Sequence, residues 1–143
     1  MREPSQSLAS GLIDTNVFIH AYANNAHTSE CRRFLVAVEQ GRVEAHLEPM
    51  VLHELSYALP RYIKQITRDQ LAAYMLMVLK WAGVRGERDL MADAVHRWHA
   101  TRGLSFVDAF LAARASRDIG SVFTKNIQEL RGQGMDVPDP LPG

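Results

Sequence analysis

The sequence has one cysteine, no excess of either charge and no long apolar run. The single cysteine, Cys31, excludes an intrachain disulfide and a zinc site built from several cysteines, and it is consistent with a reducing compartment. Cys31 is spaced with Phe34, Leu35 and Val38 as neighbours on one helical face would be. That spacing favours a place in the core over a reactive thiol.

Other absences limit the partners and the location. Sixteen basic residues balance sixteen acidic ones, so no global positive field attracts nucleic acid, and any such binding must be local. No stretch reaches the roughly twenty uncharged apolar residues of a membrane helix, and residues 1–7 lack the apolar run of a secretory signal. We therefore expect a cytoplasmic protein with no membrane partner.

What the chain does contain is typical of one soluble globular domain. It has 143 residues, of which 47% are hydrophobic and 22% are charged, and it shows no internal repeat. We expect a single domain over residues 1–143, with a flexible leader over residues 1–10 and a flexible tail over residues 138–143.

Apolar periodicity and turn residues predict alternating strands and helices. The expected strands cover residues 11–14 (buried), 43–47, 84–85 and 121–124, with an edge strand near 135–137. The expected helices cover residues 15–23, 29–40, 49–62 (ended or kinked by Pro60), 67–82, 88–101 and 105–118. This order indicates an α/β domain with a mostly parallel sheet, in which ligands bind at the carboxyl ends of the strands.

Three carboxylates, Asp14, Glu54 and Asp108, stand in apolar segments with no adjacent Lys or Arg. An ionised acid in apolar surroundings costs several kcal/mol unless a cation or hydrogen-bond donors compensate it. The predicted topology allows one edge of the sheet to collect all three. The economical hypothesis is a shared divalent metal ion, which prefers oxygen ligands and promotes in-line hydrolysis of a phosphodiester.

Each acid also has a simpler explanation. Asp14 could cap the helix that follows it, and Glu54 could face solvent. Ser105 and Asp108 have the spacing of a capping box. The joint occurrence of the three acids at one predicted edge favours the metal site over these separate explanations.

At these residues the chain resembles the PIN-domain family, particularly the small VapC-like ribonuclease toxins of toxin–antitoxin pairs. The resemblance covers most of the chain and depends on four segments: residues 13–16, 51–55, 105–109 and 124–126. It implies a three-layer α/β/α sandwich, an endoribonuclease dependent on Mg²⁺ or Mn²⁺, and a cognate antitoxin that blocks the acidic pocket. Relatives dimerise, so we also expect a homodimer.

The resemblance further implies roles for individual residues. Asp14, Glu54 and Asp108 would bind the metal and activate water, and Asn16 and Thr124 would support the pocket through hydrogen bonds.

Asn126 departs from the pattern, because many relatives place a fourth acid at this position. Asn126 would then serve as a supporting residue, and Glu129, three residues further on, is a candidate source of the missing carboxylate.

Several basic residues could offset the repulsion between the acidic pocket and a phosphate. Lys125 is the leading candidate because it adjoins Asn126. A local basic cluster is formed by Arg61, Lys64 and Arg68. Its simplest explanation is that each residue is a charge solvated at the surface.

An apolar helical face with Tyr74, Met75, Met77, Val78 and Trp81 is wider than one buried stripe requires. Core packing is its default explanation, and a protein interface is the alternative.

Two rival functions remain open. One is a catalytically weak protein that keeps the fold and uses the acidic pocket only for binding. The other is a nuclease specific for DNA or for a nucleic-acid structure, because the same metal chemistry serves either sugar.

Overall fold

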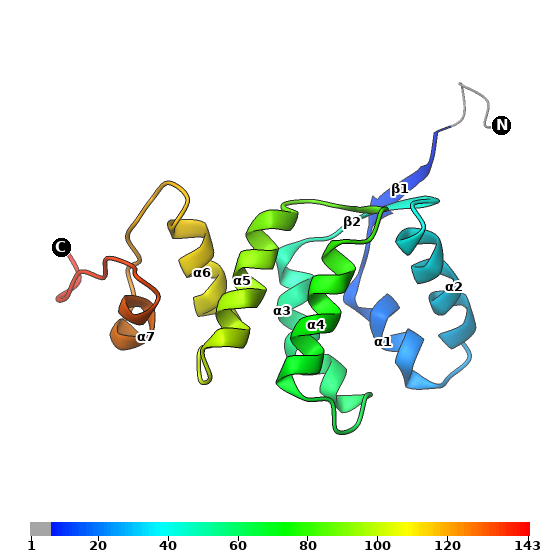
Figure 1. The fold of residues 1–143 in the computed structure, drawn as a ribbon, viewed down its shortest axis with the longest axis horizontal. Helices are drawn as coiled ribbons and strands as arrows, with labels where there is room; N and C mark the ends of the chain where they lie inside the picture. The colour runs from blue at the N-terminus through cyan, green and yellow to red at the C-terminus, as the bar shows by residue number, and fades with distance from the viewer. Residues whose placement is uncertain (1–6) are drawn as a thin grey trace. The chain divides into compact units, whose positions relative to one another are not determined.

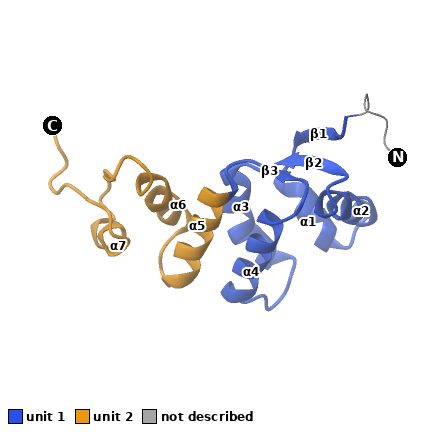
Figure 2. Ribbon diagram, turned by 45° about the horizontal axis from the view of Figure 1, so that its top comes forward, with its two compact units in different colours: residues 1–88 blue, residues 89–143 orange. Residues whose placement is uncertain are grey.

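The computed structural model describes residues 7–143, and the chain divides into two compact units, Met1–Arg88 and Asp89–Gly143 (Figure 2). The part of the expected flexible leader that covers residues 1–6 lies outside the described residues. Both units contribute residues that the sequence singles out. Asp14 and Glu54 belong to the first unit, and Asp108 and Asn126 to the second.

The first unit contains a parallel sheet with the strand order β1-β2-β3. Its strands are β1 (Ala9–Leu12), β2 (Val43–His46) and β3 (Val84–Arg85). Figure 1 labels β1 and β2, and Figure 2 labels all three strands. The first crossover contains α1 (Thr15–Ala23) and α2 (Thr28–Glu39), and the second contains α3 (Pro49–Ala58), the 3-10 turn η1 (Leu59–Arg61) and α4 (Arg68–Leu79). Helical crossovers are what parallel strands require. The expected α/β class with a parallel sheet is thus confirmed.

The first strand differs from the prediction in both position and burial. It covers Ala9–Leu12 rather than residues 11–14, all four residues are exposed, and Ala9 and Ser10 therefore do not belong to a flexible leader. Backbone hydrogen bonds, rather than burial of side chains, hold this strand in the sheet. Ala9 pairs with Val43, and the ladder continues beyond the strand because Ile13 N–H donates to the His46 carbonyl at 3.1 Å.

The helices of the first unit follow their sequence signals closely. Pro49 occupies the first turn of α3, where its missing N–H costs nothing. The helix changes to a 3-10 turn at Pro60, as the prediction allowed. Thr67 and Gln70 form a complete capping box at the start of α4, with both hydrogen bonds at 3.0 Å. Packing between α1 and α3 joins the two elements that follow β1 and β2.

The core of the first unit lies between these helices and the sheet. Its largest fully buried side chains come from the two crossovers: Phe18, Val38, Leu47, Leu52, Leu55, Leu59, Met75 and Val78. Cys31 is partly buried on α2 beside this core, which agrees with a packing role.

The helices of the second unit are α5 (Arg88–Ala100), α6 (Phe106–Ala115) and α7 (Ile127–Gly132). The boundary between the units follows Arg88, the first residue of α5. A small cluster of buried apolar residues lies between α6, α7 and the neighbouring segments: Ala112, Ala115, Val122, Leu130 and Val137. The predicted helices 88–101 and 105–118 are confirmed, although the second ends at Ala115.

The strands predicted at 121–124 and near 135–137 are wrong as strands. They reduce to a single parallel bridge between Ser121 and Asp136. Val122 is the buried residue of this segment, whereas Phe123 is 68% exposed, so burial holds only part of the segment. The Thr124 hydroxyl accepts a hydrogen bond from Asn126 N–H at 2.9 Å, and this turn leads directly into α7, which the sequence analysis missed.

Among the described residues, no helix is both long enough and apolar enough to cross a lipid bilayer.

Candidate functional site

Asp14 and Glu54 line one pocket of about 420 Å³ in the first unit. Asp14 lies two residues after β1 at the N-cap of α1, and Glu54 lies on α3, the helix that follows β2. Because β1 and β2 are parallel neighbours, their carboxyl ends share one edge of the sheet. The structure therefore brings the first two of the three predicted acids together.

The Asp14 carboxylate is exposed, so the expectation of apolar surroundings is wrong for this residue. The backbone of β1 is itself exposed, which leaves Asp14 at the surface where the strand ends. Asp14 occupies the N-cap position of α1, yet its side chain makes no capping hydrogen bond. The simpler explanation as a cap therefore fails, and the carboxylate lies in the pocket beside a helix N-terminus, which favours negative charge.

Thr15 and Asn16 continue the pocket wall on the first turn of α1. Asn16 is exposed, whereas Thr15 is only 6% exposed. The Thr15 Oγ1 atom is buried and has no hydrogen-bond partner among the described residues. Buried hydroxyls are normally hydrogen-bonded to protein or to ordered water. The Thr15 hydroxyl is therefore a buried polar group that no described protein atom satisfies.

The rim of the same pocket carries residues that the sequence analysis did not connect with the acids. Tyr57, Arg61 and Tyr62 line it, from the end of α3 and from η1. Arg61 was considered only as part of a basic cluster, and neither tyrosine was considered. The spacing of Glu54, Tyr57 and Arg61, three and then four residues apart, is the signal that could have found this face.

The third acid, Asp108, is 7% exposed and lies in the second unit, on the first turn of α6. Asp108 N–H donates to Ser105 Oγ at 3.1 Å, so the predicted N-cap is confirmed. Asn126 Nδ2 donates to Asp108 Oδ2 at 3.0 Å. At the position where the family pattern led us to expect an acid, Asn126 thus supplies a hydrogen-bond donor to the buried carboxylate.

The remaining candidates of the second unit lie close to Asn126 in sequence. Thr124 orients Asn126 through the hydrogen bond to its backbone N–H. Lys125 Nζ forms an ion pair with Asp139 at 3.0 Å, and the Lys125 side chain is 64% exposed. An exposed pair of this kind is weak, so a phosphate could compete for Lys125. Glu129 is exposed on the first turn of α7.

The donor chemistry of these residues suits a hard cation. Carboxylate, hydroxyl and amide oxygens are the ligands that Mg²⁺ and Mn²⁺ prefer. Across residues 7–143, no three His, Cys, Asp or Glu side chains are grouped so that they could hold a metal ion. Asp14 and Glu54 supply two carboxylates to the pocket of the first unit, and a joint site with Asp108 remains a prediction.

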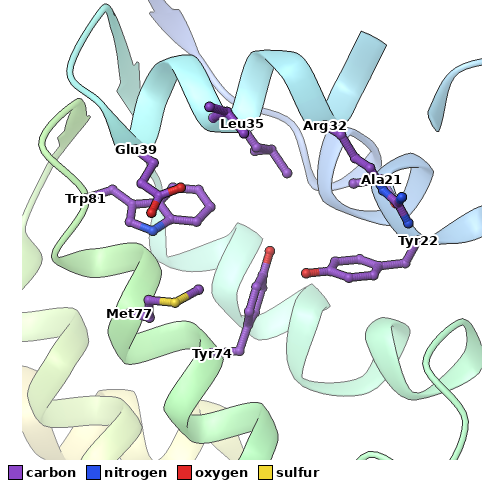
Figure 3. A pocket seen from close by; sticks show the side chains of 9 residues that line it. Ala21, Tyr22, Arg32, Leu35, Glu39, Tyr74, Met77 and Trp81 are labelled. Atoms are coloured by element: carbon purple, nitrogen blue, oxygen red, sulfur yellow. The ribbon is translucent and has the colours of Figure 1, made fainter. Parts of the chain in front are cut away.

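A second cavity of about 300 Å³ lies on the predicted apolar face of α4 (Figure 3). Met75 and Val78 of this face are fully buried in the core, whereas Met77 is 47% exposed and lines the cavity. Figure 3 shows the hydroxyls of Tyr22 and Tyr74 pointing toward one another. Burial, together with a side-chain hydrogen bond between these two tyrosines, raises the pKa of Tyr74 far above its usual value. The face is therefore partly core and partly an open groove.

Comparison with known proteins gives one match. A family model described as the PIN domain matches residues 11–128. No curated protein and no solved structure matches the chain. The matched range includes all three candidate acids and Asn126, and it spans most of both units.

Proposed function

Because the chain belongs to the PIN domain family, whose members are generally metal-dependent nucleases, we propose that it is an endoribonuclease that hydrolyses RNA phosphodiester bonds with Mg²⁺ or Mn²⁺. The observation that carries the proposal is the pocket of the first unit. Two carboxylates, Asp14 and Glu54, line it together with Thr15, whose buried hydroxyl has no partner among the described residues.

In this proposal Asp14, Glu54 and Asp108 would hold the metal, and their carboxylates would orient the attacking water. A divalent ion bound there would supply Lewis acidity to that water and to the phosphate. Asn126 holds Asp108 in place through the hydrogen bond to Oδ2, and Thr124 holds Asn126. Asn16 contributes a polar wall to the pocket. Lys125 contacts a substrate phosphate, and Glu129 is the candidate fourth acid.

We also propose that the protein is the cytoplasmic toxin of a type II toxin–antitoxin pair and forms a homodimer. The support is the resemblance of its motifs to VapC-like toxins. In that setting a cognate antitoxin blocks the acidic pocket.

A cleavage assay tests the nuclease proposal. Matched RNA and DNA are incubated with the full chain in Mg²⁺ and in chelator. We expect RNA to be cut only with Mg²⁺, and we expect Asp14→Asn and Asp108→Asn each to reduce cleavage by more than about a hundredfold because each removes a metal ligand. Glu30→Gln and Asp118→Asn are matched controls, since they neutralise exposed acids outside the proposed site.

Two results would count against this proposal. Full cleavage by both Asp variants would reject the catalytic assignment and leave a protein that uses the pocket only for binding. Cleavage of DNA in preference to RNA would show that the substrate is DNA.

A further inference from the structure

The rim of the acidic pocket combines two aromatic rings with one cation. Tyr57, Arg61 and Tyr62 line the same pocket as Asp14 and Glu54. Tyr57 is 51% exposed and Tyr62 is 46% exposed, although tyrosine rings usually bury much of their surface. Exposed rings beside an acidic pocket need an explanation, because their apolar faces are hydrated in the free protein.

The segment that carries these residues is well anchored. The Leu59 side chain is fully buried beneath it. The Leu59 carbonyl accepts hydrogen bonds from Tyr62 N–H and Ile63 N–H, both at 2.9 Å. The Tyr57 ring also meets His53 edge to face, with the ring centroids 5.4 Å apart. The backbone of this segment and the Tyr57 ring are therefore held in place before any ligand binds, which reduces the entropy lost on binding.

Arg61 follows Glu54 by seven residues and belongs to η1 rather than to α3. The rise per residue of the two helix types puts about 10 Å or slightly more of helix axis between the two positions. Arg61 is exposed, and within the described part of the chain no carboxylate forms an ion pair with it. The guanidinium is thus available to an anion, and the Arg61 backbone is separated along the chain from that of Glu54. A phosphate next to the one being hydrolysed is an anion that fits this position.

We propose that Tyr57, Arg61 and Tyr62 bind the substrate strand beside the scissile bond. Arg61 donates hydrogen bonds to the oxygens of a neighbouring phosphate, for which its planar fork is well suited. Tyr57 and Tyr62 stack on bases that are unpaired, because stacking on a side chain requires a base face that a neighbouring base pair does not cover. The three residues act as substrate-binding residues and favour cleavage at unpaired positions.

This inference rests on the proposed nuclease function, but a binding experiment tests it separately. The probe is a fluorescent single-stranded RNA of about twelve nucleotides, and its anisotropy is followed with Asp14→Asn protein in Mg²⁺ so that cleavage does not interfere. The comparison ligand is a duplex of the same sequence.

We expect Tyr57→Leu and Tyr62→Leu each to weaken binding of the single strand by roughly fivefold to a hundredfold. Tyr57→Phe should keep most of the affinity because the ring remains. The tyrosine variants should leave duplex binding unchanged.

Arg61→Gln should weaken binding about tenfold and should lower the dependence of log affinity on log salt by about one. Lys64→Gln is the matched control, because Lys64 is an exposed cation three residues away that does not line the pocket. Its effect should be clearly smaller.

Three outcomes would overturn the inference. The first is unchanged RNA binding in both leucine variants, and the second is an equal loss of RNA affinity for Arg61→Gln and Lys64→Gln. The third is that the Asp14→Asn protein without further substitutions does not bind the single strand. Failure of the nuclease proposal would look different. The wild-type chain would then cut neither RNA nor DNA, while the variants would still lose binding in the expected pattern.

Discussion

The buried Asp108 carboxylate depends on a neighbour that its own motif does not contain. Ser105 caps the backbone of α6, while Asn126, eighteen residues further on, donates directly to the carboxylate. A donor to the carboxylate leaves its charge available for a metal and fixes its orientation. Partners of this kind affect metal affinity strongly even though they do not touch the metal.

Replacing Asn126 by Leu removes the donor and keeps a similar volume. We expect the Mg²⁺ concentration for half-maximal RNA cleavage to rise roughly tenfold, because Asp108 loses its fixed orientation. Titration of Mg²⁺ in the cleavage assay measures the shift. Gln128→Leu, an exposed change on the same short helix, serves as the control and should leave the titration unchanged. An unaltered Mg²⁺ requirement in Asn126→Leu would contradict the assigned role.

Thr15 offers a test in which stability and activity move in opposite directions. Its buried hydroxyl has no partner among the described residues, so Thr15→Val removes an unsatisfied polar atom at nearly constant shape. We expect the free energy of unfolding in urea to rise by up to about 1 kcal/mol. RNA cleavage should fall, because the pocket wall loses a polar group next to Asp14. A loss of stability with full activity would show that Thr15 serves the fold alone.

Residue patterns predicted the roles of some side chains better than others. The cap at Ser105 was readable because its partner lies three residues away. The hydrogen bond between Asn126 and Asp108 was not, because it joins residues far apart in sequence. The exposure of Asp14 was also missed, since apolar neighbours in sequence do not show which face of a strand end meets solvent.

Among the elements of the second unit, α5 is joined to the end of α6 by a small charged network. Asp93 on α5 accepts hydrogen bonds from Arg97 and from Arg117, each at 2.9 Å. Burial alone would raise the pKa of Asp93, but the hydrogen bonds from Arg117 and Arg97 outweigh it and hold the pKa below its usual value. The folded state is therefore stabilised when Asp93 is ionised.

The sign of this shift fixes a pH dependence. A lowered pKa in the folded state adds stability above the unfolded value of about 3.9, and this stability is lost as the pH falls through the folded value. We expect Asp93→Asn to lower the free energy of unfolding by about 1 kcal/mol at pH 7, a modest amount because the Arg117 side chain is 38% exposed. Urea unfolding at pH 7 and near pH 2 measures the difference. A deficit that persisted at the lower pH would argue against an electrostatic origin.

Gly83 marks a close approach of three elements in the first unit. Gly83 N–H donates to the Val38 carbonyl at the end of α2, and Ala45 N–H on β2 donates to the Gly83 carbonyl, both at 2.8 Å. A Cβ atom at Gly83 would collide with the carbonyl oxygens of Val43 and Val38. A shift of the Val38 carbonyl away from that Cβ atom would weaken its hydrogen bond from Gly83 N–H.

We therefore expect Gly83→Ala to destabilise the fold by about 3 kcal/mol. Denaturant unfolding measures the loss. Gly11→Ala is the matched control, because a Cβ at Gly11 meets no atom within 4 Å and should change stability by no more than about 0.5 kcal/mol. Equal effects of the two substitutions would contradict the close approach.

The helices were more predictable than the strands for a physical reason. Caps, prolines and apolar spacing are local, and they located α3 and α4 within a few residues. Strands depend on partners that are distant in sequence. Because Ala9 pairs with Val43, β1 begins two residues before the predicted strand. Residues 121–124 form a single bridge to Asp136 rather than a ladder.

At the scale of the whole molecule, our proposal is that acids distant in sequence share one metal ion, and the family match over residues 11–128 supports it. The sequence placed Asp14 and Glu54 after neighbouring parallel strands, and the structure has both in one pocket. Asp108 belongs to the second unit, and its inclusion depends on the motif order within the matched range of residues 11–128. A joint role for acids from both units is therefore the central claim.

The most direct measurement of this claim is Mn²⁺ binding, followed by electron paramagnetic resonance, in the wild-type chain and in the single variants Asp14→Asn and Asp108→Asn. Shared coordination predicts that each variant binds Mn²⁺ at least tenfold more weakly than the wild type, while Asp118→Asn binds it normally. Wild-type affinity in Asp108→Asn, with binding lost in Asp14→Asn, would contradict the account, because the metal would then need only the first unit.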